Sequence, residues 1–519
     1  MTGGVLSRLA RLPATPLGRL RRALRDPVRT QHRLLRKLLR RAEHTDWGRT
    51  HGFAPALQSD DVVQAFQEYQ GLNSYHAVRA YVDRARAGEA NVLWPGRTRH
   101  FGISSGTVSS GQLIPVSPAM LRAMTRSSLV PGLQYGSVRS FGYLGGKILS
   151  IPGGVSEDPA RPGVWVGEVS GLMAAAVPNV MSRRFQAIPR QLMLMEGWDE
   201  KLQQIATHTA RQDIRAIIMV PSWAPMLFDM VLGSSQSDAT THAARVREVW
   251  PGLQVFFSGG VALRSYRPIL ERYLGSDVDL IESYSASEGF FAFQDDVDAC
   301  DLLLHVDSGV FYEFVRIEEV DRDRPARHTV ADVEPGVDYA LFVSTCSGLW
   351  AYEVQDVVRF TSTSPLRLRV VGRTGAILDE FGEALHAEEV ELALAHAARL
   401  TGARCLHHHV TYAPTTGAVT QHEWLLEFAV APDDLGAFTA ALDGYLQEHN
   451  RHYLIRREPG VLAPPAVTVL PSGACVTYLR RHRTRMSAQT KLPSVSPDRD
   501  VATGLREAAG SLVVESGLQ

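Results

Sequence analysis

The chain has 519 residues, a formal net charge of −1, 45% hydrophobic residues and 21% charged residues. This length exceeds what one hydrophobic core supports and predicts at least two domains. The composition excludes wholesale disorder, and the net charge gives no reason to expect a nucleic-acid partner. Four widely separated cysteines and the lack of an apolar run of about 20 residues predict a cytoplasmic protein without a transmembrane segment.

The first 43 residues are strongly basic, with twelve Arg or Lys residues against Asp26 and Glu43. No apolar stretch of roughly 7–15 residues follows the first arginines, so we expect no secretory signal. Leucines recur at helical spacing from Leu34 to Leu39 among cationic residues, which predicts an amphipathic helix. Such a helix either contacts an anionic membrane surface or packs its apolar stripe on the first domain, the interpretation that we favour.

Helical patterns alternate with short β-rich runs along the first part of the chain. The runs are 216–220, 255–258, 280–284, 339–345 and 357–361. This alternation predicts an α/β fold in which helices flank β-sheets.

The pattern changes after Gly372, where the sequence predicts a small α+β domain of ordinary size. Its expected elements are a helix at 386–400, strands at 405–412 and 422–430, and a helix at 435–449. We therefore predict a large N-terminal domain at 1–372 and a small, mobile C-terminal domain at 373–519.

A loop rich in hydroxyl groups and glycine follows a short apolar strand and begins Ser104-Ser105-Gly106-Thr107. Glycine lets the backbone approach a ligand closely, and successive N–H groups with Ser/Thr hydroxyls can cradle phosphate oxygens. The loop lacks the Gly-Lys-Ser/Thr ending of a Walker A loop. By composition alone such Ser/Gly loops are more often plain linkers.

The segment from Tyr284 to Gly289 follows another apolar strand and includes Ser287 and Glu288. Ligands bind at strand ends in open α/β sheets. The Glu288 carboxylate could bind a Mg²⁺ ion that bridges ATP phosphates, and Tyr284 offers a face for an adenine ring. The alternative is a surface glutamate after a turn.

Other candidate ligand groups lie further apart in the sequence. Ser258-Gly259-Gly260 forms a tight turn after an apolar strand, which would expose backbone at the strand end. Asp356 at a strand edge could accept hydrogen bonds from ribose hydroxyls, and Arg373 could support the same ligand or be a surface cation. Lys491 by itself is typical of a solvent-exposed loop lysine.

Taken together, these segments resemble the acyl acid amido synthetases of the auxin-responsive Gretchen Hagen family, within the adenylate-forming superfamily. The matching segments are, in chain order, Thr45–Phe53, Gly88–Gly96 leading into Ser104–Thr107, Pro221–Trp223, Ser258–Gly260, Tyr284–Gly289, Gly309–Phe314, Val371–Arg373, Gly382-Glu383 and Lys491–Pro493. Each match is short, and their shared order and spacing make the resemblance specific.

The resemblance implies a ligase that uses ATP and Mg²⁺ to activate a carboxylic acid as an acyl-adenylate, which an amine, usually an amino acid, then attacks. It implies that the Ser104–Thr107 loop holds phosphates, Ser258–Gly260 turns at the adenine and Tyr284 flanks it. It further implies that Glu288 binds Mg²⁺. It implies that Asp356 binds the ribose and that Lys491 neutralises the negative charge that develops during the reaction. Lys491 is then carried on a small domain that rotates about Arg373–Ala376.

The chain also departs from the family pattern in four places. The phosphate loop is shorter than usual and has Gln112 near the place of a lysine. Before Asp356, Glu353 and Gln355 replace the usual Arg and Gly. Further along, Ala384 stands where a lysine is common, and Ser494 replaces an arginine. The sequence therefore leaves two alternatives to amide formation, namely transfer of the acyl group to a thiol, or a weakened member that binds a small acid or nucleotide without turnover.

Overall fold

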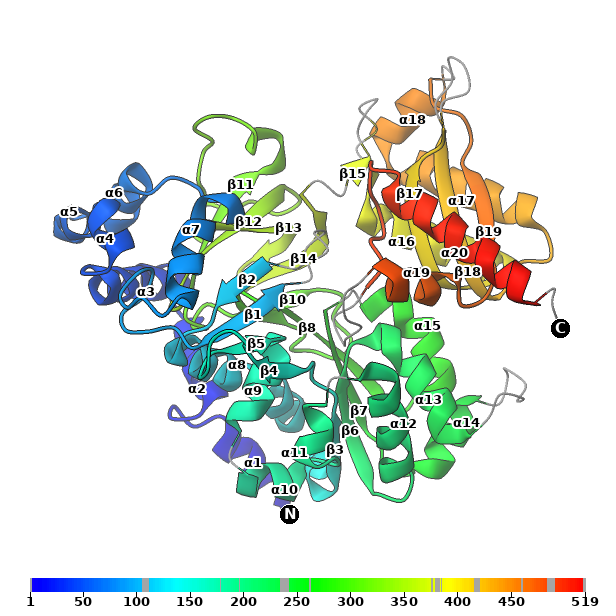
Figure 1. The fold of residues 1–519 in the computed structure, drawn as a ribbon, viewed down its shortest axis with the longest axis horizontal. Helices are drawn as coiled ribbons and strands as arrows, with labels where there is room; N and C mark the ends of the chain where they lie inside the picture. The colour runs from blue at the N-terminus through cyan, green and yellow to red at the C-terminus, as the bar shows by residue number, and fades with distance from the viewer. Residues whose placement is uncertain are drawn as a thin grey trace. The chain divides into compact units, whose positions relative to one another are not determined.

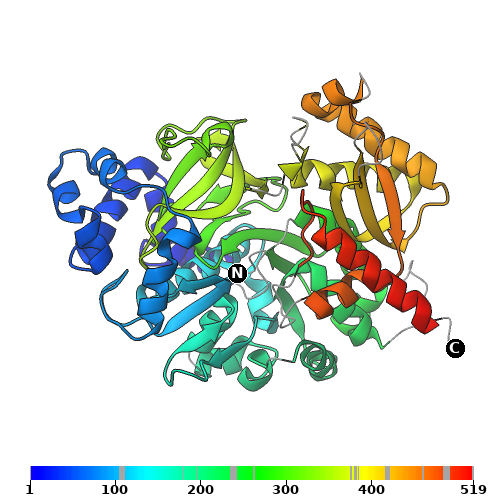
Figure 2. The ribbon, with the colours of Figure 1, turned by 45° about the horizontal axis from the view of Figure 1, so that its top comes forward.

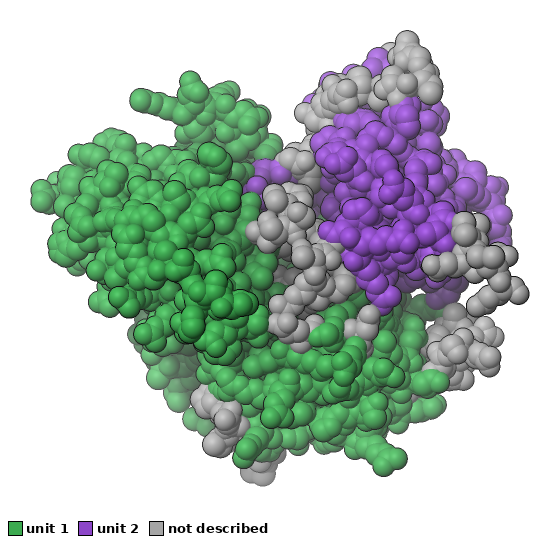
Figure 3. Space-filling view, in the orientation of Figure 1, with its two compact units in different colours: residues 1–354, 358–369, 487–489 green, residues 355–357, 370–486, 490–519 purple. Residues whose placement is uncertain are grey.

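A computed structural model shows that the chain forms two compact units (Figure 3). The structure describes residues 2–104, 112–177, 179–195, 197–233, 242–260, 263–374, 377–378, 383, 385–414, 421–458, 461–482 and 491–516. The first unit contains residues 1–354, 358–369 and 487–489, and the second contains residues 355–357, 370–486 and 490–519. Both combine helices and sheets (Figures 1 and 2), which confirms the predicted α/β class.

The main sheet has ten strands in the order β11-β12-β13-β14-β10-β9-β8-β7-β6-β3. Its parallel part consists of β3 (Lys147–Ser150), β6 (Ile214–Met219), β7 (Val255–Gly259) and β8 (Asp279–Ala286). The remaining strands are β9 (Gly289–Phe293), β10 (Leu302–Leu304), β11 (Val310–Arg316), β12 (Asp338–Thr345), β13 (Tyr352–Thr363) and β14 (Leu366–Arg373). All five strands predicted from β-rich runs are present in this sheet.

Helices connect and cover the parallel strands (Figure 1). They are α12 (Trp198–Thr209), α13 (Ala224–Leu232), α14 (His242–Val249) and α15 (Leu263–Leu274). The first four residues of β7 are all buried, as expected for a parallel strand that is covered on both faces and therefore has an unbroken apolar sequence. Parallel strands connected through helices end at one common edge, which positions the candidate site.

A smaller sheet carries the start of the predicted phosphate loop. It contains β1 (His100–Ser104), β2 (Gln112–Pro115), β4 (Val155–Glu157) and β5 (Trp165–Gly167), in the order β2-β1-β5-β4. Strands β1 and β2 are antiparallel, and Ser104 pairs with Gln112. The loop therefore leaves and re-enters the sheet at one point; its residues 105–111 lie outside the described part of the chain.

The predicted basic amphipathic helix is α3 (Pro27–Ala42), which begins after the N-cap Asp26. Its leucines Leu35, Leu38 and Leu39 are buried, so the apolar stripe packs on the protein, as the favoured interpretation predicts. Those leucines are therefore not available to lipid. Among the described residues, no helix combines the length and apolarity that would let it cross a bilayer.

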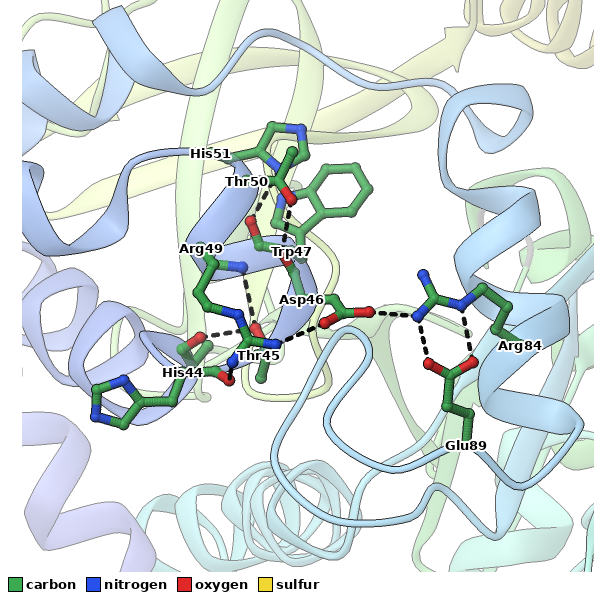
Figure 4. A network of polar contacts seen from close by, with 11 residues as sticks. His44, Thr45, Asp46, Trp47, Arg49, Thr50, His51, Arg84 and Glu89 are labelled. Carbon is green, nitrogen blue, oxygen red and sulfur yellow. Dashed lines mark hydrogen bonds and ion pairs between the residues drawn. The ribbon is translucent and has the colours of Figure 1, made fainter.

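The segment Thr45–Phe53, which resembles the family's N-terminal signature, makes polar contacts with residues further along the chain (Figure 4). Thr45 caps α4 (Asp46–Thr50) by accepting a hydrogen bond of 3.0 Å from the Gly48 amide. Asp46 accepts hydrogen bonds from Arg49 and Arg84, and Arg84 also pairs with Glu89, from the second matching segment. These residues hold the early helices to the loop before β1.

The second unit contains the elements predicted after Gly372. They are α16 (Ala387–Thr401), β17 (Arg404–Tyr412), β18 (His422–Val430) and α17 (Leu435–His449), followed by β19 (Ala466–Leu470). The sheet order is β17-β18-β19, with β17 antiparallel and β19 parallel to β18. Helices α16 and α17 bury Val390, Leu394, Phe438 and Leu442 in one core with Trp424 of the sheet.

A buried carboxylate stabilises this unit. Glu383 is fully buried and accepts hydrogen bonds from Tyr412 Oη at 2.7 Å and from His422 Nε2 at 3.0 Å. Burial raises the pKa of Glu383, but the hydrogen bonds from His422 and Tyr412 outweigh it, so that the pKa lies below its ordinary value. A depressed carboxyl pKa stabilises the fold above the unfolded-state pKa, and this stability is lost as the pH falls through the folded-state pKa.

We expect Tyr412→Phe to lower the free energy of unfolding by about 1.5–3 kcal/mol at neutral pH, because it removes a buried hydrogen bond to a charged group. The loss should shrink as the pH falls and Glu383 becomes protonated. Urea unfolding at neutral and acidic pH measures both effects. The control is Tyr69→Phe, because the Tyr69 side chain is 51% exposed and its change should stay within about 0.5 kcal/mol. Equal losses in the two variants would contradict the assignment.

Candidate functional site

The parallel strands β6, β7 and β8 end side by side. In the sheet register, Ser258 of β7 lies beside Met219 of β6, and Gly259 lies beside Ser283 of β8. The next residue, Gly260, has φ +86°, a left-handed conformation that favours glycine. The tight turn predicted at Ser258–Gly260 is therefore present at the carboxyl edge of the sheet, where open α/β sheets bind ligands.

Three buried polar atoms at this edge have no hydrogen-bond partner among the described residues. They are Ser258 Oγ, Ser222 Oγ and Trp223 Nε1. Ser222 and Trp223 lie in the short 3₁₀ helix η2 (Pro221–Trp223), which directly follows β6 and the connecting residue Val220. Because buried polar groups are nearly always hydrogen-bonded, these three atoms are candidates to bind water or a polar ligand. Ser222 and Trp223 were not among the predicted site residues, although the Pro-Ser-Trp match pointed to their position.

A β-hairpin joins this edge to the phosphate-loop strand. Strands β8 and β9 are antiparallel with Ala286 opposite Gly289, so Ser287 and Glu288 form the two-residue turn. Ser287 Oγ donates a hydrogen bond of 3.3 Å to the Ile103 carbonyl oxygen in β1. This contact brings together two segments that are 184 residues apart in the sequence.

Glu288 is only 6% exposed, so the alternative of a surface glutamate after a turn is wrong. A buried carboxylate is costly unless it is paired, hydrogen-bonded or bound to a cation. Among the described residues no three His, Cys, Asp or Glu side chains gather as a metal site. Carboxylate oxygens and phosphate oxygens are both ligand types that Mg²⁺ prefers.

Tyr284 lies inside β8, opposite Ala292 of β9. Its side chain is 9% exposed and packs edge-on with Phe291, with ring centroids 5.0 Å apart. The ring is therefore held rigidly beside the turn at Gly259. A fixed aromatic ring at this place is suited to flank a flat heterocycle.

The other predicted residues belong to the second unit. Arg373 Nε lies 3.5 Å from Asp356 Oδ1, and Arg373 Nη2 donates a 3.3 Å hydrogen bond to Gln355 Oε1. Gln355 has φ +67°, which costs free energy for a residue other than glycine. Gln355 stands where the family usually has a glycine, and its left-handed backbone conformation is one that glycine adopts without strain. The Gln355 side chain contacts Arg373 instead of being free.

Lys491 is partly buried and lies within electrostatic range of Asp356 and Arg373. Burial lowers the pKa of Lys491, and Arg373 lowers it further, against the raising effects of Asp356 and Glu391. The interpretation as an ordinary solvent-exposed lysine therefore does not hold. The structure gathers Lys491, Asp356 and Arg373 within one unit.

The predicted phosphate loop is only partly described. Ser104 lies at the end of β1, whereas Ser105, Gly106 and Thr107 lie outside the described residues. Gln112, near the place of the family's lysine, accepts a 3.3 Å hydrogen bond from Tyr352 Oη. It is therefore a neutral structural contact, and the loop lacks the cation that the family has there.

Comparison with known proteins assigns most of the chain to one family. The GH3 family N-terminal domain matches residues 16–176 and 132–279, the GH3 family central domain matches residues 303–373, and the GH3 family C-terminal domain matches residues 388–500. A putative indole-3-acetic acid-amido synthetase GH3.10 from Oryza sativa subsp. japonica is 27% identical over 65% of this chain and 76% of that protein. An indole-3-acetic acid-amido synthetase GH3.3 from Arabidopsis thaliana is 26% identical over 40% of this chain, and the match spans 37% of that relative.

Solved structures show the same fold. The AtGH3.15 acyl acid amido synthetase in complex with 2,4-DB superposes with a TM-score of 0.76 at 17% identity, covering 96% of each chain. A 2-hydroxyisobutyryl-CoA ligase in its postadenylation state superposes with a TM-score of 0.58 at 13% identity, covering 93% of this chain and 91% of that one. With the three domain matches in their family order, this chain belongs to the GH3 family.

Proposed function

We propose that this protein is an acid–amine ligase that uses ATP to activate a carboxylic acid as an acyl-adenylate and then forms an amide with an amine. The proposed amines are amino acids. The observation that carries the proposal is the Ser287–Ile103 contact, which joins the phosphate-loop strand to the buried Glu288 at the carboxyl edge of the sheet. The names of the GH3 relatives, amido synthetases, support the amide-forming step.

The residues present fit a nucleotide. We propose that adenine binds beside the Tyr284 ring and the buried Ser258 Oγ, which has no hydrogen-bond partner among the described residues. We propose that Ser104 begins the loop that holds the phosphates. We propose Glu288 as the protein ligand of a Mg²⁺ ion, which would neutralise phosphate charge as pyrophosphate leaves. Ser105, Gly106 and Thr107 remain proposed phosphate ligands.

In the second unit, we propose that Asp356 accepts hydrogen bonds from the ribose and that Arg373, whose Nε lies 3.5 Å from Asp356 Oδ1, orients the Asp356 carboxylate. Lys491 would supply a positive charge during adenylation. The functional division into 1–372 and a mobile 373–519 remains a prediction, as does the cytoplasmic location. Small acids and amines are the proposed partners, with no nucleic acid in the reaction.

Isotope exchange between pyrophosphate and ATP, measured across a panel of aromatic, aliphatic and hydroxy acids, tests the first step. We expect exchange that depends on an acid and on Mg²⁺. Mass spectrometry after addition of single amino acids, or of coenzyme A, then separates amide from thioester formation. Nucleotide or acid binding without any acid-dependent exchange would overturn the ligase assignment and favour the non-catalytic alternative, which Gln112 and Gln355 support by departing from the family pattern.

A further inference from the structure

Charge is segregated along this chain. The first 43 residues carry twelve Arg or Lys residues and two acidic residues, a net charge of +10, whereas the whole chain carries −1. The rest of the chain therefore carries −11. The basic residues lie in and between α1 (Thr2–Ala10), α2 (Pro16–Ala23) and α3. Such asymmetry indicates a surface that attracts an anionic partner.

The cations of this segment are not used in ion pairs. Within the described part of the chain, none of the twelve forms an ion pair with a carboxylate. The hydrogen bonds that their side chains donate go to uncharged groups, for example from Arg11 to the Ser137 carbonyl oxygen and from Arg21 to Gln134 Oε1. Their positive charge therefore remains available to an external anion.

Part of this charge lies on α3 and on α2, which packs on α8 (Pro118–Val138), and α8 adds the exposed Arg122 and Arg126. The carboxylate of Asp307 is exposed and lies within electrostatic range of four cations. Two of these, Lys37 and Arg126, also act on Cys346 together with Arg122. The four are Arg19, Arg33, Lys37 and Arg126. We call Arg19, Arg33, Lys37, Arg122 and Arg126 the basic cluster. These five cations carry one sign of charge on a small set of neighbouring elements, which favours a positive local potential.

Exposed leucines accompany the charge. Leu6 and Leu9 of α1 and the following Leu12 are 44%, 49% and 48% exposed, while Ala10 is buried against Tyr135 of α8. The helix therefore packs on the protein through its other side and leaves apolar side chains beside arginines. This combination is typical of helices that lie at a membrane interface.

We propose that the N-terminal helical segment docks the protein on an anionic membrane surface, with the basic cluster contacting lipid phosphates and Leu6, Leu9 and Leu12 entering the headgroup boundary. The leucines favour a lipid surface over a nucleic acid, because apolar side chains gain from leaving water at the acyl boundary but add nothing to phosphodiester contacts. This proposal is independent of the ligase reaction.

Cosedimentation of the full chain with vesicles tests it. We expect binding to vesicles of phosphatidylcholine with about one-third phosphatidylglycerol, little binding to phosphatidylcholine alone, and weakening at high salt. The triple variant Arg19→Glu, Arg33→Glu, Lys37→Glu should lose more than about tenfold in binding to the anionic vesicles. A second triple variant, Leu6→Ser, Leu9→Ser, Leu12→Ser, should also bind more weakly.

The matched control is Arg97→Glu, Arg211→Glu, Arg324→Glu, which reverses three exposed arginines outside the segment and should bind as the unchanged protein does. Circular dichroism checks that each variant is folded. Equal losses in the control and the cluster variant would overturn the proposal, as would binding to duplex DNA but not to vesicles. Full binding by the leucine variant would overturn the role of α1.

Discussion

Replacement of Lys491 by alanine is expected to slow acyl-adenylate formation by about 10²–10³-fold, the usual cost of removing one preorganised charge partner. The fold should remain intact, since Lys491 lies outside the helices and strands and its side chain is partly exposed. The rate of acid-dependent pyrophosphate exchange measures the effect, and urea unfolding checks the stability. Transfer from a separately supplied acyl-adenylate to the amine should be much less affected.

Two further variants make this test specific. Lys147→Ala removes another of the chain's four lysines and should leave exchange unchanged, because Lys147 Nζ donates its hydrogen bonds to the backbone carbonyl oxygens of Arg183 and Arg184. Lys491→Arg should retain part of the activity, because it keeps the positive charge. Near-normal exchange in Lys491→Ala would mean that the lysine is misassigned.

The pH dependence follows from the lowered pKa of Lys491. Only the protonated ammonium can neutralise the developing negative charge, so the adenylation rate should fall as the pH rises through a value below the ordinary 10.5. In Lys491→Arg this decrease should disappear, because guanidinium stays protonated. Persistence of the same decrease in the arginine variant would assign it to another group.

The largest stability effect is expected at a buried ion pair in the first unit. Glu313 of β11 is fully buried and receives two hydrogen bonds of 2.9 Å from Arg327, through Nε and Nη2. Gln67 Nε2 donates a third at 3.0 Å. Arg327→Met leaves the Glu313 charge buried without its cation, so we expect a loss of about 3–5 kcal/mol in the free energy of unfolding.

Urea unfolding measures this loss, with Arg322→Met as the control. Arg322 pairs with Glu319 at 2.8 Å, but its side chain is 64% exposed, and exposed pairs contribute about 0–1 kcal/mol. The double variant Glu313→Leu, Arg327→Met should recover part of the stability, because it removes the unpaired charge. A loss in Arg327→Met no larger than in Arg322→Met would show that the pair is not a stabilising contact.

The local elements of this protein follow from its sequence alone. The apolar run at 255–258 predicted the strand β7, and helices α16 and α17 and strands β17 and β18 lie within one residue of their expected positions. Periodicity, turn residues and strand length are properties of neighbouring residues, so a sequence pattern is enough to predict them. The order of short motifs likewise predicted the family that the domain matches show.

Only the tertiary structure decided which candidate groups are buried and what they contact. The burial of Glu288, the bond from Ser287 to Ile103 and the unpartnered Ser258 hydroxyl all depend on segments far apart in the chain. The same holds for the N-terminal helices, where the stripe at Leu35 packs inward while Leu6 and Leu9 stay exposed. Burial and pairing are set by the sheet order and by packing between distant elements, which no local pattern records.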